Sequence, residues 1–273
     1  MVQTDSANSD LRALESLLAF WSEAGVETCV EDEPIDRMVP LAPPQRPIAP
    51  AALRQPAAAP ESASPEIGEA LEQARSLAAA AGDLAALAEA ISAFDGCPLK
   101  SQGARQAVFS RGNPEGPVMV IGEGPGAEED QQGAPFVGRA GKLLDLMLNA
   151  AGLHDRVFIT NTVFWRPPGN RTPTFSEQSV CEPFVERAIE LVRPKMLLLV
   201  GGASAKFMLK KDEGILSLRG RWHEWRDPRA ELVLPALPTL HPAFLLRQPA
   251  AKKRAWSDLL TLTERLDRQA RPD

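Results

Sequence analysis

The sequence predicts an α/β fold in which a central parallel sheet of four strands is flanked by helices, preceded by a helical or disordered N-terminal extension. Two observations support this class. After residue 97, short apolar runs alternate with longer amphipathic segments, which is typical of parallel strands joined by helices. Each apolar run is followed by glycine or polar residues, so the strands end in loops that can carry chemistry.

The elements of this sheet follow from hydrophobic spacing. The predicted strands are VMVIG (118–122), VFITN (157–161), MLLLVG (196–201) and LVLPAL continuing into PTLHP (232–242). Amphipathic or alanine-rich spacing predicts one or two helices in 66–93 and further helices at 139–151, 176–192, 203–210 and 249–267. With helices between them, the strands run parallel and their carboxyl ends meet at one edge.

Composition divides the chain into three parts: an N-terminal amphipathic helix segment (1–33), a proline- and alanine-rich linker (34–65) and the main domain (66–273). The helix is predicted over residues 10–25, whose apolar face offers a surface for a protein partner. The linker holds nine prolines and eight alanines in 32 positions, too little branched or aromatic surface to offset its ordering entropy.

Charge is distributed unevenly along the chain. The formal net charge is −6, but residues 1–93 carry 5 basic and 15 acidic side chains, whereas residues 94–273 carry 25 basic and 21 acidic ones. The main part of the chain is therefore net positive. Three cysteines without a CxxC pair predict reduced thiols and no disulfide framework. Without a basic leader or a long apolar run, we expect a protein that lies in the cytoplasm and is not associated with membranes.

The four strand exits hold the residues with the most chemical potential. They read GEGPGAEED (122–130), NTVFWRPPGNR (161–171), GGASA (201–205) and HPAFLLR (241–247). In open parallel sheets, ligands bind beyond the carboxyl ends of the strands, so these four segments predict one site. The glycine-rich turn alone would suit a nucleotide phosphate, but the three successive acids after it would repel one.

Four ordered motifs carry a resemblance to a known family. The segments GEGPGAEEDQQGAPFVGRAGKLLD, TNTVFWRPPGNRTPT, LRGRWHEW and PTLHPAFLLR resemble, in order and spacing, the family 4 type uracil-DNA glycosylases, over roughly residues 94 to 267. The resemblance implies a uracil-DNA glycosylase-like fold and an enzyme that flips uracil out of DNA, hydrolyses its N-glycosidic bond and leaves an abasic site. Uracil-containing DNA is then the expected partner, and other deaminated bases stay open as substrates. We accordingly expect a monomer that associates with the nucleoid.

Within this resemblance, each site residue has an expected role. Asn161 is suited to uracil because its carbonyl can accept from N3–H while its amide donates to the 4-oxo group. Phe136 is expected to stack on the extruded base, and His241 to donate to the 2-oxo group as negative charge develops. The backbone at Gly124 approaches the substrate. Glu123 and Glu129 are the catalytic carboxylates, with Asp130 as the alternative and the choice between them open.

Contacts with the DNA backbone and the base stack are expected just outside this pocket. Basic side chains set the register on phosphates, and a leucine enters the stack as a wedge. The candidates are Arg166, Arg171, Arg219, Arg221 and Arg247 for phosphates, and Leu245 or Leu246 for the wedge.

The resemblance fails at one feature of the family, a [4Fe-4S] cluster held by four cysteines. Only Cys97 and Cys181 match those positions, whereas Phe94 and Trp165 stand at the other two. Cluster ligation takes four thiolates or a histidine replacement. We therefore expect no cofactor and no metal, with the two aromatic rings filling the volume of the cluster.

Two alternatives differ in class from a glycosylase. A catalytically silent relative could bind damaged DNA or a repair partner, in part through residues 10–25. A nucleotide-binding enzyme could use the glycine-rich turn at residues 122–126. A uracil-release assay separates both from an active glycosylase.

Overall fold

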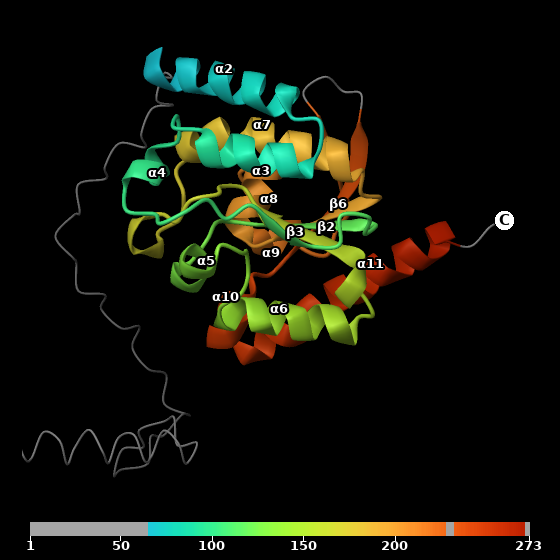
Figure 1. Ribbon diagram of the computed structural model, residues 1–273. Helices are drawn as coiled ribbons and strands as arrows, with labels where there is room; N and C mark the ends of the chain where they lie inside the picture. Colours follow the sequence, from blue (N-terminus) through green and yellow to red (C-terminus); the bar gives the residue numbers. More distant parts are fainter. Residues whose placement is uncertain (1–64, 228–231, 271–273) are drawn as a thin grey trace, which may run out of the picture. The chain divides into compact units, whose positions relative to one another are not determined.

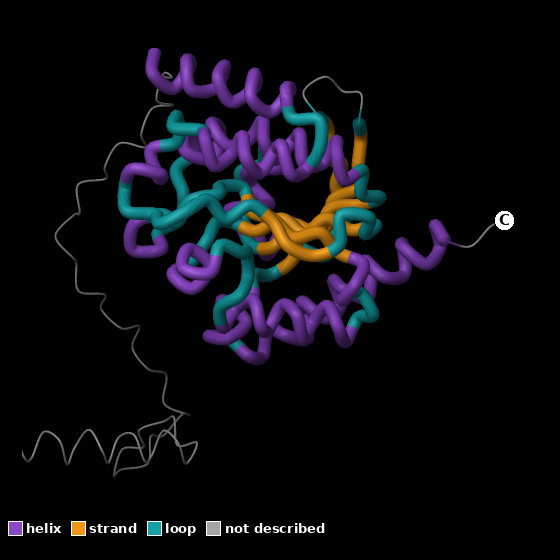
Figure 2. The backbone as a smooth tube through the Cα atoms, viewed as in Figure 1, coloured by secondary structure: helices purple, strands orange, loops and turns teal. Residues whose placement is uncertain are grey.

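The computed structural model describes residues 65–227 and 232–270, which belong to one compact unit. These residues form a six-stranded sheet with the strand order β1-β3-β2-β4-β6-β5, seen edge-on in Figures 1 and 2. The strands are β1 (Ser110–Gly112), β2 (Val118–Gly122), β3 (Val157–Asn161), β4 (Met196–Val200), β5 (His223–Arg226) and β6 (Val233–Thr239). The helix expected at residues 10–25 and residues 34–64 of the expected linker lie outside the described residues, and the linker's last residue, Pro65, instead begins α2.

The four inner strands are parallel to one another, as the sequence predicts. Every residue of β2, β3 and β4 is buried, which explains why these strands read as continuous apolar runs. The edge strands β1 and β5 pair antiparallel with β3 and β6 and were not expected. Both are short and largely polar, so they carry little of the hydrophobic signal from which strands are predicted.

Helices cover both faces of the sheet. Their bounds are α2 (Pro65–Ala80), α3 (Leu84–Ala93), α4 (Pro98–Ser101), α5 (Ala127–Gln132), α6 (Arg139–Ala150), α7 (Phe175–Val192), α8 (Gly202–Leu209), α9 (Ile215–Leu218), α10 (Pro242–Arg247) and α11 (Lys252–Ala270). In Figure 1, α2, α3, α7 and α8 lie on one side of the sheet and α6 and α11 on the other. None of these helices is long and apolar enough to span a bilayer.

Strand side chains alternate between the two cores. Met119 and Ile121 of β2 belong to the apolar cluster under α2, α3 and α7, whereas Val118 and Val120 pack with residues of α6 and α11. The predicted helices at 139–151, 176–192 and 203–210 match α6, α7 and α8 within a residue, and α2 and α3 occupy the predicted 66–93 region.

Two predicted elements have different bounds from those that the sequence suggested. The last strand stops at Thr239, because Pro242 begins α10 and His241 is its N-cap residue. The closing helix α11 starts at Lys252, after a 3₁₀ turn at Pro249–Ala251. The predicted domain boundaries at residues 33/34 and 65/66 lie in or at the edge of the part of the chain outside the described residues, and stay predictions.

Strand register brings the loops of the site together. Gly122 at the end of β2 pairs with Asn161 at the end of β3, and Val200 at the end of β4 pairs with Thr239 at the end of β6. Because all four strands are parallel, the segments that follow them leave the sheet at the same edge.

Candidate active site

A cavity of about 750 Å³ opens at the carboxyl ends of the parallel strands. It is lined by residues 123–129, 136–140, 167–173 and 241–247, although not by every residue of these ranges. Three of the four predicted strand-exit segments therefore contribute to one hollow. Of the predicted site residues, Glu123, Gly124, Glu129, Phe136, Arg171, His241, Leu246 and Arg247 line it.

The carboxamide of Asn161 is buried and without a partner. The residue is 1% exposed, and neither Oδ1 nor Nδ2 makes a hydrogen bond within the described structure. An amide left unpaired in a protein interior costs roughly 1–3 kcal/mol per group, so buried polar atoms are normally satisfied. Asn161 is not itself a lining residue of the cavity, but its unpaired donor and acceptor lie beside Phe136, which is one. A donor and an acceptor side by side form the pattern that a base edge would complete.

Phe136 lies directly beside this amide. A methyl group placed on Gly122 would overlap both Asn161 Oδ1 and the end of the Phe136 ring, so glycine is the residue that lets the two side chains approach. Phe136 has φ of +55°, a left-handed backbone conformation rare for an aromatic residue. Such strain is maintained only where the surrounding structure enforces it.

Glu129 enforces part of that conformation. Its Oε1 accepts from the backbone amides of Val137 (3.0 Å) and Gly138 (2.9 Å), and its Oε2 accepts from Gly126 (3.1 Å). The carboxylate thus joins the start of α5 to the turn that carries Phe136. Its hydrogen-bonding capacity is largely used by the protein itself, which favours a positioning role for Glu129 over contact with water.

Glu123 is the carboxylate that stays available. It lines the cavity, and no hydrogen bond or ion pair to its carboxylate is present among the described residues. Its backbone is fixed, because Thr162 Oγ1 donates to the Glu123 carbonyl (2.7 Å) and Gln178 Nε2 donates to Thr162 Oγ1 (2.9 Å). Asp130, the alternative acid, is buried and accepts from the amide of Arg105 (2.8 Å) outside the cavity lining.

His241 closes the cavity opposite the aromatic ring, with the His241 and Phe136 ring centroids 5.8 Å apart. Its Nδ1 accepts from the amide of Ala243 (3.1 Å), so the neutral imidazole carries its proton on Nε2. Burial first, and then the charge of Arg247, lower the pKa of His241 to about 4, while Glu129 opposes the shift. The ring is therefore a neutral donor at physiological pH.

Gly201 makes room for that imidazole. It follows β4 with φ of +96°, and a Cβ at this position would lie 3.1 Å from Cβ and Cδ2 of His241. Sequence reasoning assigned no individual role to Gly201, Thr162 or Gln178, and it used Gly122 only as part of the glycine-rich turn. The two glycines carried a usable signal, because each ends a predicted strand at the exits where the site is expected.

The wedge candidates separate clearly in the structure. Leu245 is fully buried and packs with Leu240 and Ala255, so it cannot enter a base stack without leaving the core. Leu246 is 38% exposed and lines the cavity, as does Arg247. Of the two leucines expected as alternatives, the geometry favours Leu246, because Leu245 packs in the core.

The arginines expected at phosphates also differ. Arg219 is committed to the protein: its guanidinium pairs with the buried Asp258, and its Nη2 donates to the carbonyl of Arg254 (2.6 Å). Thr239 Oγ1 donates to the same carboxylate (2.7 Å). This ion pair ties the loop after α9 to α11 and β6, so a structural role replaces the phosphate contact expected of Arg219.

The remaining arginines are more accessible. Arg171 forms a two-pronged ion pair with Glu177 (2.6 and 2.8 Å) but stays exposed at the cavity rim. Arg166 donates from Nε to Asn170 Oδ1 (2.7 Å), and Arg221 is exposed with no side-chain partner among the described residues.

Aromatic rings pack around the two thiols that match cluster positions in the sequence. Cys97 and Cys181 are buried with their sulfur atoms 3.8 Å apart. Phe94 and Trp165 are buried in the same cluster, with ring centroids 6.4 Å apart, and Phe184 packs edge-on against Phe94 at 5.2 Å. Within residues 65–227 and 232–270, no group of three or more histidine, cysteine or acidic side chains could hold a metal. These residues do not fit a four-thiolate cluster.

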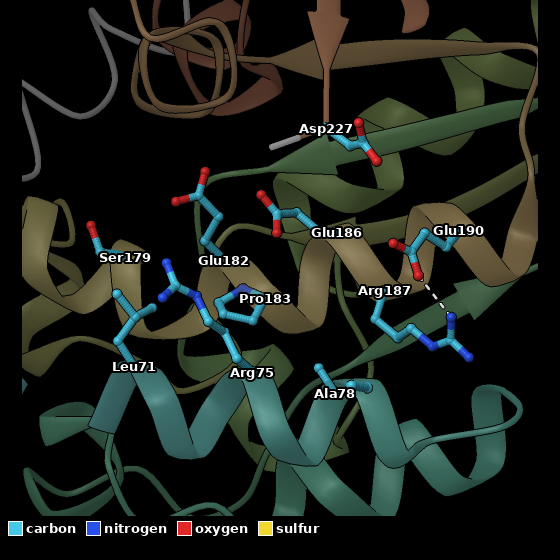
Figure 3. Close-up of a pocket in the computed structure, with 11 residues that line it drawn as sticks. Leu71, Arg75, Ala78, Ser179, Glu182, Pro183, Glu186, Arg187, Glu190 and Asp227 are labelled. Carbon is cyan, nitrogen blue, oxygen red and sulfur yellow. Dashed lines mark hydrogen bonds and ion pairs between the residues drawn. The ribbon is translucent and has the colours of Figure 1, made fainter. Parts of the chain in front are cut away.

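A second cavity, of about 350 Å³, lies between α2 and α7 (Figure 3). Glu182, Glu186 and Glu190 line it along one face of α7, together with Asp227. Burial, and then the neighbouring Glu182, raise the pKa of Glu186 to about 7. The cavity holds none of the predicted site residues and lacks an unpaired amide or an aromatic platform for a base.

Comparison with known proteins agrees with this geometry. Residues 109–260 match the model of the uracil DNA glycosylase superfamily, which is more than half of the chain, and this chain belongs to that superfamily. The type-4 uracil-DNA glycosylase of Sulfurisphaera tokodaii is 38% identical over 164 residues, covering 58% of this chain and 74% of the relative.

Two further relatives carry the same name. The type-4 uracil-DNA glycosylase of Saccharolobus solfataricus is 39% identical over 168 residues, covering 59% of this chain and 77% of the relative. That of Thermotoga maritima is 36% identical over 170 residues, covering 62% and 85%. The family resemblance seen in the four sequence motifs is thus confirmed.

The Arg219 ion pair leads to a prediction about stability. Changing Arg219 to Met should lower the free energy of unfolding by about 3 kcal/mol, because it leaves the carboxylate of Asp258 buried without its cation. Urea unfolding followed by circular dichroism measures the change. Arg221→Met, two residues away and exposed, is the control and should stay within about 0.5 kcal/mol of wild type. Equal stability of the two variants would contradict the structural role.

Proposed function

We propose that this protein is a DNA glycosylase that hydrolyses the N-glycosidic bond of uracil in DNA and leaves an abasic site. The observation that carries the proposal is the orphaned carboxamide of Asn161, held beside Phe136 at the edge of the sheet where His241 also lies. Relatives named type-4 uracil-DNA glycosylase, 36–39% identical to this chain, support the same activity.

Recognition of uracil follows from the polarity of the Asn161 amide. Oδ1 can accept from N3–H of uracil, and Nδ2 can donate to its 4-oxo group. Cytosine presents an acceptor at N3 and a donor at C4, so it would leave both atoms of Asn161 unpaired in a buried site. The cost of roughly 1–3 kcal/mol per unsatisfied group supports rejection of cytosine. The Phe136 ring supplies stacking that is tolerant of base identity.

Bond cleavage places negative charge on the departing base. The Nε2–H of neutral His241 is the donor for the 2-oxo group, and its tautomer is set by the Ala243 amide on Nδ1. A low pKa matters here, because a neutral imidazole donates without first having to be protonated. The desolvation that lowers the pKa of His241 also strengthens such a hydrogen bond relative to water.

The sugar side of the reaction falls to a carboxylate. Glu123 lines the cavity with its carboxylate unengaged, so it is the acid we assign to positioning water and to stabilising positive charge on the sugar. The side chains that line the cavity include no lysine, which supports simple hydrolysis without a lyase step through an amine.

Binding to DNA uses the rim of this cavity. Arg171 and Arg247 line the cavity, and Arg221 is exposed. We favour these three arginines and Arg166 as the contacts to DNA phosphates. Leu246 is the side chain that would hold the extrahelical state. We further propose that the protein acts on DNA as a monomer in the cytoplasm.

The proposed enzyme folds and works without an iron-sulfur cluster. Phe94 and Trp165 occupy two of the four ligand positions that the family resemblance implies, and each buries a large ring near the Cys97 and Cys181 pair. Rings of this size bury on the order of 150–250 Å² each, so hydrophobic packing can replace metal ligation as the force that orders this region.

Substitution of Asn161 tests the recognition step. Asn161→Asp removes the donor to the 4-oxo group, so excision of uracil should fall by about 10- to 100-fold while discrimination against cytosine shrinks. Single-turnover release from oligonucleotides containing one uracil or one cytosine measures both. Asn149→Asp, an exposed amide on α6, is the matched control and should behave like wild type. Unchanged excision by Asn161→Asp would remove the basis of the proposal.

Substitution of His241 tests the leaving-group step. His241→Ala should slow single-turnover cleavage by about 10² to 10³-fold, the range typical for loss of one such donor. Binding of uracil-containing DNA should change far less. His154→Ala, whose side chain is 63% exposed, serves as the control. A His241→Ala enzyme that cleaves at the wild-type rate would exclude this role.

The lowered pKa of His241 predicts a particular pH dependence. Because the pKa lies at about 4, the ring stays neutral at all higher pH, and the cleavage rate should show no histidine inflection between about pH 5.5 and 8. In the unfolded chain the pKa of His241 is near its ordinary value of 6.5, so between pH 6.5 and 4 the unfolded state binds the proton and the folded state does not. The free energy of unfolding therefore falls as the pH falls from 6.5 toward 4. A rate inflection near 6.5 that disappears in His241→Ala would contradict the assignment.

Metal analysis tests the aromatic replacement of the cluster. Protein produced in iron-supplemented medium and purified without chelator should contain far less than one iron per chain and show no broad visible absorption. Dialysis against a chelator should leave the unfolding midpoint unchanged, because no metal contributes to folding. Stoichiometric iron with visible absorption would overturn this part of the proposal without touching the base-recognition site.

A further inference from the structure

We infer that Arg111 is a positioning residue for base excision, because it fixes the turn that presents Phe136 to the flipped base. The inference rests on the proposed function, since it concerns how the same pocket is shaped. Arg111 lies on the edge strand β1, outside all four motifs that carry the family resemblance.

The guanidinium of Arg111 binds two backbone carbonyl groups of the turn. Nε donates to the carbonyl of Pro135 (2.7 Å), and Nη2 donates to the carbonyl of Phe136 (3.1 Å). Nη2 also pairs with Asp145 of α6 (2.6 Å), which holds the guanidinium in place from the other side. Only 26% of the Arg111 side chain is exposed, so these contacts are partly shielded from water.

The turn at residues 135–138 is therefore held by a cation that binds its carbonyl groups and an anion that binds its amide groups. Arg111 binds the carbonyls of residues 135 and 136, while Glu129 binds the amides of residues 137 and 138. A cation on successive carbonyls and an anion on successive amides is the arrangement that charge-assisted hydrogen bonds favour. Together they fix the peptide planes on both sides of Phe136.

Phe136 needs this restraint because its backbone is strained. Its φ of +55° places it in a region that costs on the order of 1–3 kcal/mol for a non-glycine residue. Gly141 removes a further obstacle, since a Cβ there would overlap with the Phe136 carbonyl that Arg111 binds. If the carbonyl grip is lost, the residue can relax toward negative φ, and the ring then moves away from its place between Gly122 and His241.

The geometry of arginine is specific to this task. A planar guanidinium can donate to two carbonyls and a carboxylate at once in fixed directions, whereas a lysine ammonium offers a single point of charge on a flexible stem. Lysine at position 111 should restore part of the function and methionine none of it.

The variants Arg111→Met and Arg111→Lys test this inference in the full-length protein. Two quantities are measured well below the unfolding temperature: the single-turnover excision rate, and the inhibition of excision by free uracil. For Arg111→Met we expect each to weaken by about tenfold or more, because a misplacement of about 1 Å in a site can cost up to 10²-fold. Arg111→Lys should fall between it and wild type. Arg226→Met, which breaks an exposed ion pair on the opposite edge strand, is the control and should leave both unchanged.

Coupling to Phe136 separates positioning from a general loss of stability. In a Phe136→Ala background, Arg111→Met should slow excision less than about threefold further, because the ring it positions is already gone. An equal loss in both backgrounds, or a wild-type rate and wild-type uracil inhibition in Arg111→Met, would overturn the inference. Should Arg111→Met fail to fold, the same comparison is made with Arg111→Lys.

Failure of the inference differs visibly from failure of the proposed function. A wild-type protein that releases no uracil would remove both. A wild-type protein that releases uracil, together with an equally active Arg111→Met variant, would remove only the role of Arg111.

Discussion

The site depends on the parallel register that sets Gly122 against Asn161 at the ends of β2 and β3. That pairing delivers an amide to the end of a fully buried strand and leaves, on the neighbouring strand, a position with no side chain. The Phe136 ring enters the space that glycine leaves. A shift of the register by one residue would turn the amide into the opposite core, so the hydrophobic alternation that stabilises the sheet also determines what the pocket can recognise.

Charged groups around the pocket are divided between shaping it and acting in it. Glu129 and Arg111 form hydrogen bonds with the backbone of one strained turn, and Arg219 forms an ion pair with Asp258. Glu123 and His241 also line the cavity, and among the described residues neither the Glu123 carboxylate nor Nε2 of His241 has a hydrogen-bond partner. Glu129, Arg111 and Arg219 thus restrain their neighbours, whereas these two groups stay available to a ligand.

Much of the fold and of the pocket could be predicted from the sequence. The four parallel strands are apolar runs, so periodicity predicts the sheet, and the rule that ligands bind at strand ends predicts the side on which the cavity opens. The polar edge strands β1 and β5 lack that signal. The choice between Leu245 and Leu246 depends on the direction of two adjacent side chains on one helical turn, and the partners of Glu129 and Arg219 are backbone and side-chain atoms distant in sequence. Such contacts form only in the folded chain and leave no signal in the local sequence.

The pair of thiols inside the aromatic cluster has a consequence for how the folded state can be followed. Cys97 and Cys181 are 1% and 0% exposed, with rings of Phe94, Phe184 and Trp165 packed in the same core. A water-soluble alkylating reagent can reach these sulfurs only when the surrounding helices separate. The rate at which these two thiols are alkylated therefore reports how often the core opens, and no added probe is needed.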